Sequence, residues 1–262
     1  MSTMFSIERQ ALILELLDEF GKVDVKELAA KFSTSNETIR RDLRELEGSG
    51  ILKRTHGGAV IIPGNRSEGY EYPLLARGIQ RFEEKQIICR TAATLLEDGD
   101  TIFLDNSSTT MSLIRFVPPD IKITVVTNSI KIMLEASKFN KQNIVVIGIG
   151  GVLNQKNYSL TGMFSLDFAK NFFPDKAFMS CRGVDEKSGM TDASILEIEV
   201  KRLMLTRSKQ FILLADYSKF GLIGPVFMGD LSDVDCVITD SKADPDKLRI
   251  FDLNQTRILQ AT

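Results

Sequence analysis

Polar and glycine residues gather directly after three short apolar runs of the sequence, and this arrangement suits the binding of a small anion. The clusters are Asp105–Thr110, Thr127–Asn128 and Gly150–Gly151. Hydroxyl and backbone N–H donors can surround a phosphate group, and glycine lets the main chain approach it closely. Each cluster alone is typical of a helix cap or a turn, so their repetition supports the prediction. The candidate anion-binding residues in them are Asp105, Ser107, Ser108, Thr109, Thr110, Thr127, Asn128, Gly150 and Gly151.

The cluster Asp105–Thr110 runs into the apolar segment Met111–Ile114, which predicts a helix whose positive N-terminal end adds to the phosphate cradle. Asp105 could cap that helix or bond a sugar hydroxyl. Lys219, just past Asp216, could supply a mobile positive charge or could simply be solvated.

A sheet of parallel strands would position these clusters. Six apolar, β-branched runs recur after residue 100. A helical pattern over 84–96 precedes the first of them, and helical patterns over 129–139 and 195–207 lie between later ones. Alternation of strand and helix predicts an α/β domain whose ligands bind beyond the carboxyl ends of the strands. The predicted strands span 101–105, 123–128, 144–148, 177–181, 211–216 and 236–240.

The first sixty residues show the pattern of three helices and a hairpin. Ser6, Asp24 and Ser35 start the helices, and apolar residues follow each of them at helical spacing. A tight polar turn over 33–35 separates the second helix from the third, and a hairpin with a glycine turn is predicted over 51–60. This combination predicts a winged helix-turn-helix. The second helix of that motif, which is the third predicted helix, would enter a DNA major groove.

The outward face of the third helix carries Arg40, Arg41 and Arg44. The planar fork of arginine can grip a phosphate or the edge of a guanine. The alternative is a solvated helix face on which these arginines pair with Glu37 and Glu45. The turn, the helix cap and the wing together favour DNA binding.

The composition excludes a wholly disordered chain, a collagen and a small disulfide-stapled protein. The 262 residues are 43% hydrophobic and 26% charged with a formal net charge of -2, as in a folded globular protein without a strong overall field. The sequence has no apolar run long enough to span a membrane, and its first ten residues do not have the basic start and apolar core expected of a signal peptide. Its one histidine and three scattered cysteines offer no metal-ligand spacing. Leu153 stands where a dinucleotide fingerprint would need a third glycine. We expect a cytoplasmic protein with reduced thiols, no catalytic residues, no metal and no cofactor.

A stretch rich in helix breakers and small polar residues, between Val60 and Tyr72, divides the chain. We predict a winged helix-turn-helix DNA-binding domain over 1–60, a linker over 61–80 and an α/β domain over 81–262.

The N-terminal pattern resembles the signature of DeoR-type bacterial transcription regulators. The matching residues are Glu27-Leu28-Ala29, Ser35, Thr38-Ile39-Arg40-Arg41-Asp42-Leu43 and Arg54-Thr55-His56-Gly57-Gly58-Ala59. The resemblance implies that the start of the third helix lies at the operator and that the sole histidine lies in the wing, where it could equally be a turn residue bonded to backbone. The candidate DNA-binding residues are Ser35, Asn36, Thr38, Arg40, Arg41, Arg44, Arg54 and His56.

The remaining residues resemble the sensor domain of the same family, which is similar to sugar-phosphate isomerases and coenzyme A transferases. Asp185 and Lys219 lie in matching segments and join the candidate effector-binding residues. The sequence has Ser108 where the family usually has a glycine before its paired threonines. The matching segments are Asp105–Thr110, Thr127-Asn128-Ser129, Gly150-Gly151, Gly183-Val184-Asp185, Gly189-Met190-Thr191, Ala215-Asp216, Ser218-Lys219-Phe220 and Thr239-Asp240.

The resemblance implies a sequence-specific regulator of a carbohydrate operon, expected to be a repressor that binds double-stranded operator DNA and responds to a phosphorylated sugar. Operator symmetry predicts a homodimer or homotetramer, for which Phe164–Phe173 is either an assembly surface or part of the core. One alternative is a sugar-phosphate isomerase with an accessory DNA-binding domain, using Asp105, Asp185 and Lys219. Another is a DNA-binding activator that binds no metabolite. The attached DNA-binding domain favours a regulator over an enzyme.

Overall fold

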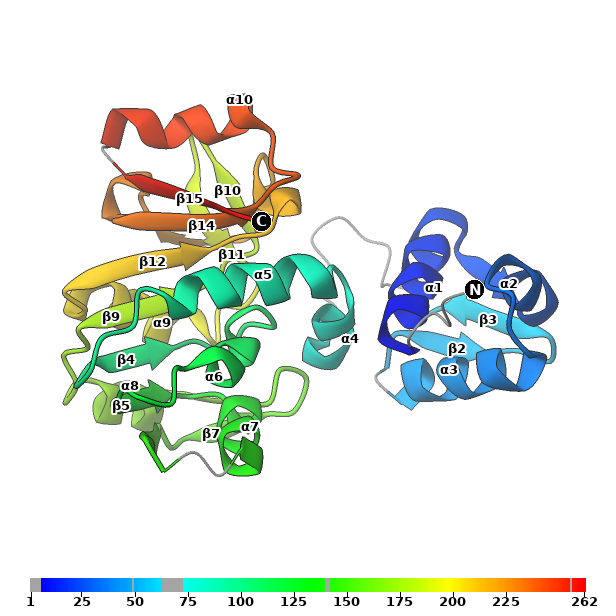
Figure 1. Ribbon diagram of the computed structural model, residues 1–262, viewed down its shortest axis with the longest axis horizontal. Coiled ribbons are helices and arrows are strands. Elements are labelled where there is room, and N and C mark those ends of the chain that lie inside the picture. The colour runs from blue at the N-terminus through cyan, green and yellow to red at the C-terminus, as the bar shows by residue number, and fades with distance from the viewer. Residues whose placement is uncertain (1–5, 49, 63–72, 140–141, 255) are drawn as a thin grey trace. The chain divides into compact units, whose positions relative to one another are not determined.

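The computed structural model describes residues 6–48, 50–62, 73–139, 142–254 and 256–262. The chain divides into two compact units, Met1–Phe82 and Glu83–Thr262 (Figure 1). The central part of the predicted linker, residues 63–72, lies outside the described residues. Both ends of that linker are structured, because Ile61 is the last residue of a strand and Leu74–Ile79 forms a helix, α4.

The described part of the N-terminal unit combines helices with a three-stranded antiparallel sheet. Its elements are α1 (Ser6–Phe20), β1 (Lys22–Asp24), α2 (Val25–Lys31), α3 (Asn36–Gly48), β2 (Leu52–Arg54) and β3 (Gly58–Ile61), followed by α4. The predicted hairpin is present as β2 and β3, and the unpredicted strand β1 pairs with the other side of β3. Gly58 permits this pairing, since a Cβ there would lie 1.9 Å from the Val23 carbonyl oxygen.

The helices of this unit begin where the sequence offers a cap. The Asp24 carboxylate accepts the backbone N–H groups of Lys26 at 2.7 Å and Glu27 at 3.2 Å, which starts α2. The predicted apolar stripes of the helices are buried in one core, and Ala76 of α4 belongs to the same core. That core includes Ile13, Leu14, Leu17, Leu28, Ile39, Leu43, Leu46 and Ile51.

The C-terminal unit contains one large sheet, two small antiparallel sheets and helices on both sides. The large sheet has β4 (Thr101–Leu104), β5 (Ile123–Thr127), β6 (Ile144–Gly148), β9 (Lys176–Met179), β12 (Gln210–Leu214), β14 (Cys236–Asp240) and β15 (Arg257–Ala261). The small sheets have β7 (Val152–Asn154) with β8 (Ser159–Thr161), and β10 (Gly183–Asp185), β11 (Gly189–Asp192) and β13 (Val226–Gly229). The helices are α5 (Phe82–Ala93), η1 (Thr110–Ser112), α6 (Leu113–Phe116), α7 (Ile130–Phe139), α8 (Met163–Ala169), α9 (Ile198–Arg207), η2 (Tyr217–Lys219), η3 (Leu231–Asp233), α10 (Pro245–Leu248) and η4 (Arg249–Asn254).

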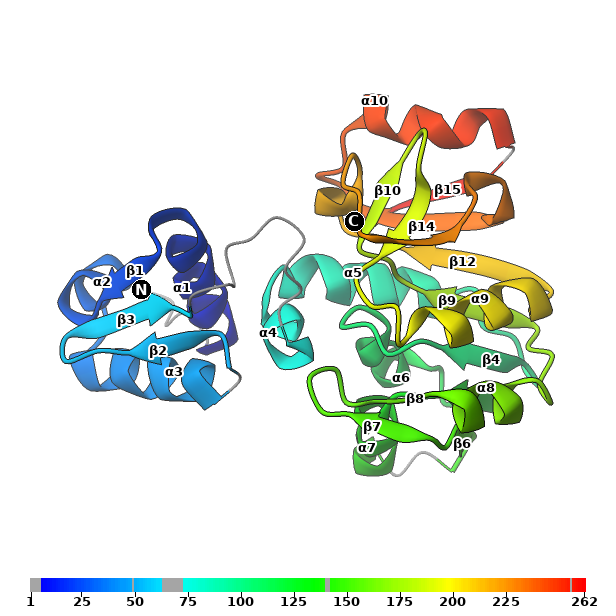
Figure 2. The same ribbon diagram turned by 180° about the vertical axis from the view of Figure 1, so that it is seen from behind.

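The large sheet is parallel throughout, with strand order β15-β14-β12-β9-β4-β5-β6. The six predicted strands all belong to it, whereas the edge strand β15 and the small sheets were not predicted. Helices α5, α7 and α9 correspond to the predicted helical stretches. Figures 1 and 2 show α5 and α6 on one face of the sheet and α8 and α9 on the other.

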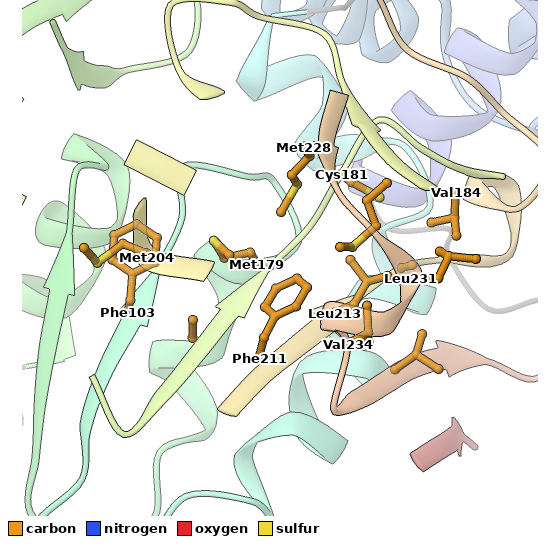
Figure 3. Close-up of a cluster of buried hydrophobic side chains, with 14 of the residues drawn as sticks. Phe103, Met179, Cys181, Val184, Met204, Phe211, Leu213, Met228, Leu231 and Val234 are labelled. Carbon is orange, nitrogen blue, oxygen red and sulfur yellow. The ribbon is translucent and has the colours of Figure 1, made fainter. Parts of the chain in front are cut away.

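Alternate strand residues fill two cores, one on each face of the large sheet. Phe103 packs with Met204 of α9 on one face (Figure 3). Ile102 packs with Ile88 of α5 on the other. A parallel sheet covered on both faces explains why its strands are almost continuously apolar in the sequence.

The cysteines Cys89, Cys181 and Cys236 are free and buried, as the sequence predicted. Burial raises the pKa of the Cys89 and Cys181 thiols to about 12. The phenylalanines at the ends of the segment 164–173 are largely exposed, Phe164 to 78% and Phe173 to 67%, so they do not belong to the core. In the described parts of the chain, we find no helix with the length and hydrophobicity to cross a membrane.

Candidate nucleic-acid interface and effector site

Ser35 sets the start of α3. Its hydroxyl accepts the backbone N–H of Thr38 at 3.1 Å and lies 2.9 Å from the Thr38 hydroxyl. Ser35 and Asn36 are exposed and Thr38 is half-buried, while Ile39 is fully buried beside them. The first turn of α3 therefore presents polar side chains on one surface, as a helix that reads base edges requires.

The three arginines of α3 extend this surface along the helix. Each is more than half exposed. Arg44 pairs with Glu37 at 2.9 Å, Arg41 with Glu45 at 3.2 Å, and Arg40 with Glu37 at 3.9 Å. The ion pairs expected for a solvated helix face are thus present. Exposed pairs stabilise by only about 0–1 kcal/mol, so DNA phosphates could replace the glutamates at little cost.

Arg54 and His56 lie on the wing, formed by β2, β3 and their turn. Arg54 pairs with Glu47 at 2.7 Å, and its backbone N–H donates to the same carboxylate at 2.9 Å. The backbone hydrogen bond from Arg54, followed by its side-chain hydrogen bond, holds the pKa of Glu47 below its usual value. His56 is exposed at the turn, where the Thr55 N–H donates to the Gly58 carbonyl at 2.9 Å. Glu47 therefore ties the wing to α3.

A buried ion pair that the sequence did not predict holds α3 against α1. The Arg9 guanidinium meets the Asp42 carboxylate through Nε at 2.5 Å and Nη2 at 3.1 Å. Asp42 is 1% exposed and also accepts the Ser6 hydroxyl at 3.0 Å. Asp42 lies between Arg41 and Leu43 and looked like one more surface charge, so the sequence offered only its helical position as a signal.

In the C-terminal unit, Asp105 organises the loop that follows β4. Its Oδ1 accepts the Ser107 N–H at 3.1 Å and the Thr110 hydroxyl at 2.7 Å. Its Oδ2 accepts the Ser180 N–H at 3.1 Å and lies 2.9 Å from the Lys201 ammonium. Asp105 is fully buried. These contacts give Asp105 a positioning role for the loop, and its predicted contact with the effector stays a prediction.

The Asp105–Thr110 loop separates into internally bonded residues and free donors. The Ser107 hydroxyl lies 2.8 Å from the Thr110 hydroxyl and accepts its N–H at 3.2 Å. Within the described residues, the backbone N–H groups and hydroxyls of Ser108 and Thr109 make no hydrogen bond. The expected helix after the loop is only the turn η1 and the four-residue α6, so its dipole adds little. Ser108 and Thr109 are the donors available to an anion.

The predicted residues after β5 and β6 have mixed environments. The Thr127 hydroxyl donates to the Leu104 carbonyl at 2.7 Å and so joins β5 to β4. The Asn128 amide donates to the Leu160 carbonyl at 3.2 Å. Gly150 is exposed and has open space where a Cβ would lie. Gly151 has φ +143°, and a Cβ there would lie 2.0 Å from the Ser165 Oγ, so packing on α8 explains this glycine.

Lys201 is the principal residue of this site that the sequence analysis missed. Its ammonium, buried on α9, contacts Asp105 at 2.9 Å, Asp192 at 2.5 Å and the Ser180 carbonyl at 2.9 Å. Burial opposes its charge, but the two carboxylates outweigh burial and raise its pKa. The feature of the sequence that could have identified Lys201 is its place on the apolar face of a predicted helix, three residues after Ile198.

Lys219 of η2 and Asp185 of β10 lie on neighbouring segments, because Val184 forms a β-bridge with Phe220 and its carbonyl accepts the Gly221 N–H at 2.7 Å. Burial dominates the raised pKa of Cys181, and the positive charge of Lys219 is the strongest influence that opposes this shift. Lys219 ends η2, which follows β12, so it lies at the same carboxyl end of the parallel sheet as Asp105, which follows β4. Asp185 lies at the turn between β10 and β11, where its carboxylate accepts the N–H groups of residues 187 and 188 at 3.0 and 2.9 Å. These backbone bonds, Ser188 first, lower the pKa of Asp185.

Two family models match the chain, over separate ranges. Residues 9–64 match the family described as "DeoR-like helix-turn-helix domain", and residues 80–241 match "DeoR C terminal sensor domain". "Uncharacterized HTH-type transcriptional regulator YulB" of Bacillus subtilis is 38% identical over 97% of this chain and 96% of that protein. The "Glycerol-3-phosphate regulon repressor" of Escherichia coli is 31% identical over 91% and 92%. A solved ribose 5-phosphate isomerase from Methanocaldococcus jannaschii covers 53% of this chain and 55% of its own, at 16% identity and a TM-score of 0.40.

Both family matches fall in the predicted order, a helix-turn-helix first and a sensor domain second. The relatives are named as regulators of transcription, which points away from an enzyme. The chain belongs to the DeoR family of transcriptional regulators.

Proposed function

We propose that this protein represses a carbohydrate operon and leaves its operator when a phosphorylated sugar binds the C-terminal unit. The observation that supports DNA binding is the exposed face of α3, which presents polar residues and arginines. The Escherichia coli relative is named as a repressor of a glycerol-3-phosphate regulon, which supports both repression and a phosphorylated ligand. A differential affinity of about 1–3 kcal/mol between the two states would change operator affinity about 5- to 150-fold.

Operator binding can be tested by selection from random DNA. Duplexes selected from a random-sequence library by the full chain, then titrated by fluorescence anisotropy, should converge on a sequence with two related half-sites. Addition of the effective phosphorylated sugar should release them. A deletion strain should gain transcripts of the operon; a loss of transcripts would instead assign an activator.

The free donors of Ser108 and Thr109 support the assignment of the phosphate position. Thr109→Asp would place a negative charge among them, so we expect loss of the response to phosphorylated sugars with unchanged operator affinity. Thr94→Asp adds the same charge at an exposed position at the end of α5 and should leave the response intact. A normal response in Thr109→Asp would remove this loop from the site.

The enzyme alternative needs a free carboxylate base and an electrophilic group. Lys201 has three N–H donors and three acceptors around it, and Asp105 accepts from four groups. Their mutual saturation supports a regulator without turnover. Conversion of pentose or hexosamine phosphates that disappears in Lys219→Ala would contradict this.

An exposed apolar surface supports self-association of the chain. Glu197, itself buried, accepts the side-chain amides of Asn154 at 3.0 Å and Asn157 at 2.8 Å, which holds the β7–β8 hairpin against the start of α9. Monomers rarely expose apolar patches beyond a few hundred Å², and a stable dimer buries roughly 800 Å² per partner. We use the name α8 surface for six exposed apolar residues of α8, the β7–β8 hairpin and the segment before α9. They are Val152, Leu153, Met163, Phe164, Ile195 and Leu196, with exposures between 47% and 78%.

The occupant of the α8 surface is a second copy, since two related half-sites require two recognition helices. Phe164→Glu should shift the sedimentation coefficient to that of a smaller assembly and weaken operator binding. Phe227→Glu makes the same change at another exposed phenylalanine, 48% exposed on β13, and should do neither. An unchanged assembly in Phe164→Glu would exclude the α8 surface.

A further inference from the structure

Four buried side-chain oxygens in the described part of the C-terminal unit lack the hydrogen bond that buried polar atoms normally have. Two are the hydroxyls of Thr239 and Thr256, and two are the amide Oδ1 atoms of Asn106 and Asn128. The two asparagines are 3% and 2% exposed. Asn106 was not among the site residues predicted from the sequence.

Both asparagines lie at the same edge of the sheet as the anion-binding loop. In the β4–β5 pairing, Leu104 is opposite Thr127. Asn106 follows the first strand by two residues, and Asn128 directly follows the second. The hydrogen bond from the Thr127 hydroxyl to the Leu104 carbonyl, 2.7 Å long, holds these two ends together.

The orientation of the Asn128 amide is fixed by its own hydrogen bond. Its Nδ2 donates to the Leu160 carbonyl at 3.2 Å, and the Leu160 N–H donates back to the Asn128 carbonyl at 2.8 Å. A flipped amide would place two acceptors against each other, so Oδ1 is the end without a partner. An acceptor left in this state is destabilising unless a bound group donates to it.

The chemistry of these atoms differs from that of their neighbours. Ser108 and Thr109 offer donors, which suit a phosphate, whereas Asn106 and Asn128 offer acceptors, which suit hydroxyl groups. We infer that Asn106 and Asn128 accept hydrogen bonds from hydroxyls of the same ligand and select a polyhydroxylated phosphate over a bare phosphate or a deoxy analogue. This inference rests on the proposed function. A site built around such bonds rejects a ligand that lacks the hydroxyl, because its acceptors are then buried without partners.

The test uses two variants of similar shape change at opposite ends of the sheet. Asn106→Leu removes the orphan oxygen at the carboxyl end. Thr256→Val removes an orphan hydroxyl just before β15, at the amino end. Melting of the full chain would be followed with inorganic phosphate, glycerol 3-phosphate, ribose 5-phosphate, 2-deoxyribose 5-phosphate and fructose 1-phosphate.

In the ligand-free protein, neither variant should melt at a lower temperature than wild type, since each loses an unsatisfied polar atom. Asn106→Leu should bind the best sugar phosphate about tenfold or more weakly, while Thr256→Val should bind it as wild type does. The wild type should prefer a hydroxylated phosphate to inorganic phosphate, and Asn106→Leu should lose that preference.

Three results would overturn the inference. A lower melting temperature of ligand-free Asn106→Leu would show that the oxygen has a structural partner. Unchanged sugar-phosphate affinity in Asn106→Leu, with binding intact in wild type, would reject the role of Asn106 and leave the proposed function standing. Binding of none of the five compounds by wild type would reject the proposed effector class and the inference with it.

Discussion

The ammonium of Lys201 lies 2.9 Å from the carboxylate of Asp105, and this contact joins α9 to the loop after β4. Asp105 holds the Ser107 N–H and the Thr110 hydroxyl, so the loop that offers Ser108 and Thr109 to an anion takes its shape from a residue on a distant helix. Asp192, at the end of β11, shares the same ammonium. A movement of α9 would therefore reach the anion-binding loop directly.

Lys201→Met should disrupt both stability and the effector response. It leaves the buried carboxylates of Asp105 and Asp192 without their cation, which typically costs about 3–5 kcal/mol of unfolding free energy. Lys176→Met is the matched control, because Lys176 is equally buried and pairs with Asp100 at 2.8 Å at the amino end of the sheet. Urea unfolding should show a loss for both variants, and only Lys201→Met should lose the response to sugar phosphate beyond that explained by unfolding. Equal responses in the two variants would refute the positioning role.

Arg41→Ala should weaken operator binding and reduce the slope of log affinity against log salt by about one if the side chain contacts a phosphate. Its guanidinium is exposed and pairs with Glu45 at 3.2 Å. Arg249→Ala removes the same charge from an exposed pair with Asp246 in the C-terminal unit and should leave the slope unchanged. A constant slope with relaxed base preference in Arg41→Ala would assign Arg41 to a base edge; no effect at all would remove it from the interface.

Gly150 and Gly151 offer a matched pair of substitutions. Gly151→Ala should lower the unfolding free energy by about 1–3 kcal/mol, since its Cβ would overlap the Ser165 Oγ and its φ is positive. Gly150→Ala enters open space and should change stability by less than about 0.5 kcal/mol. If the main chain at Gly150 approaches the effector, calorimetry should still record weaker sugar-phosphate binding by Gly150→Ala. Unchanged binding would remove Gly150 from the effector site.

Asp175 should make a pH-dependent contribution to stability. The Asp175 carboxylate accepts hydrogen bonds from the Lys209 ammonium at 2.8 Å and from the Thr101 N–H at 2.9 Å. These bonds lower the pKa of Asp175. A carboxyl with a lowered folded-state pKa stabilises the fold above its ordinary pKa of about 4, and this contribution disappears as pH falls through the folded-state value. Asp175→Asn should therefore lower the unfolding free energy by about 0.5–1 kcal/mol at pH 7.

The difference between Asp175→Asn and wild type should shrink as the pH falls below about 4, because Asp175 loses its charge as the pH passes through its lowered folded-state pKa. Denaturant unfolding at several pH values would measure it. A difference that stays constant from pH 7 to pH 2 would mean that the charge of Asp175 does not contribute.

The sequence predicted the elements that depend on local patterns. Helical spacing around Ile39 and Leu43, the caps at Asp24 and Ser35, and the continuous apolar strands all have a local physical cause. The strands were therefore found, and with them the edge of the sheet at which Asp105 and Asn128 lie together.

Contacts between distant segments could not be predicted in the same way. Lys201 and Asp42 resemble surface charges in the sequence, because their partners are far along the chain. The same is true of Asn106, whose side chain differs from an ordinary loop asparagine only through its burial. The strand β1 was missed since its pairing depends on Gly58 rather than on any property of its three residues.

The most direct test of the account is a titration of the selected operator duplex with the full chain, at rising salt, with and without phosphorylated sugars. We expect affinity to fall linearly on a log–log plot with salt, and one sugar phosphate to weaken it about 5- to 150-fold at constant salt. Operator affinity that equals the affinity for random DNA, or that no phosphorylated sugar changes, would contradict the account.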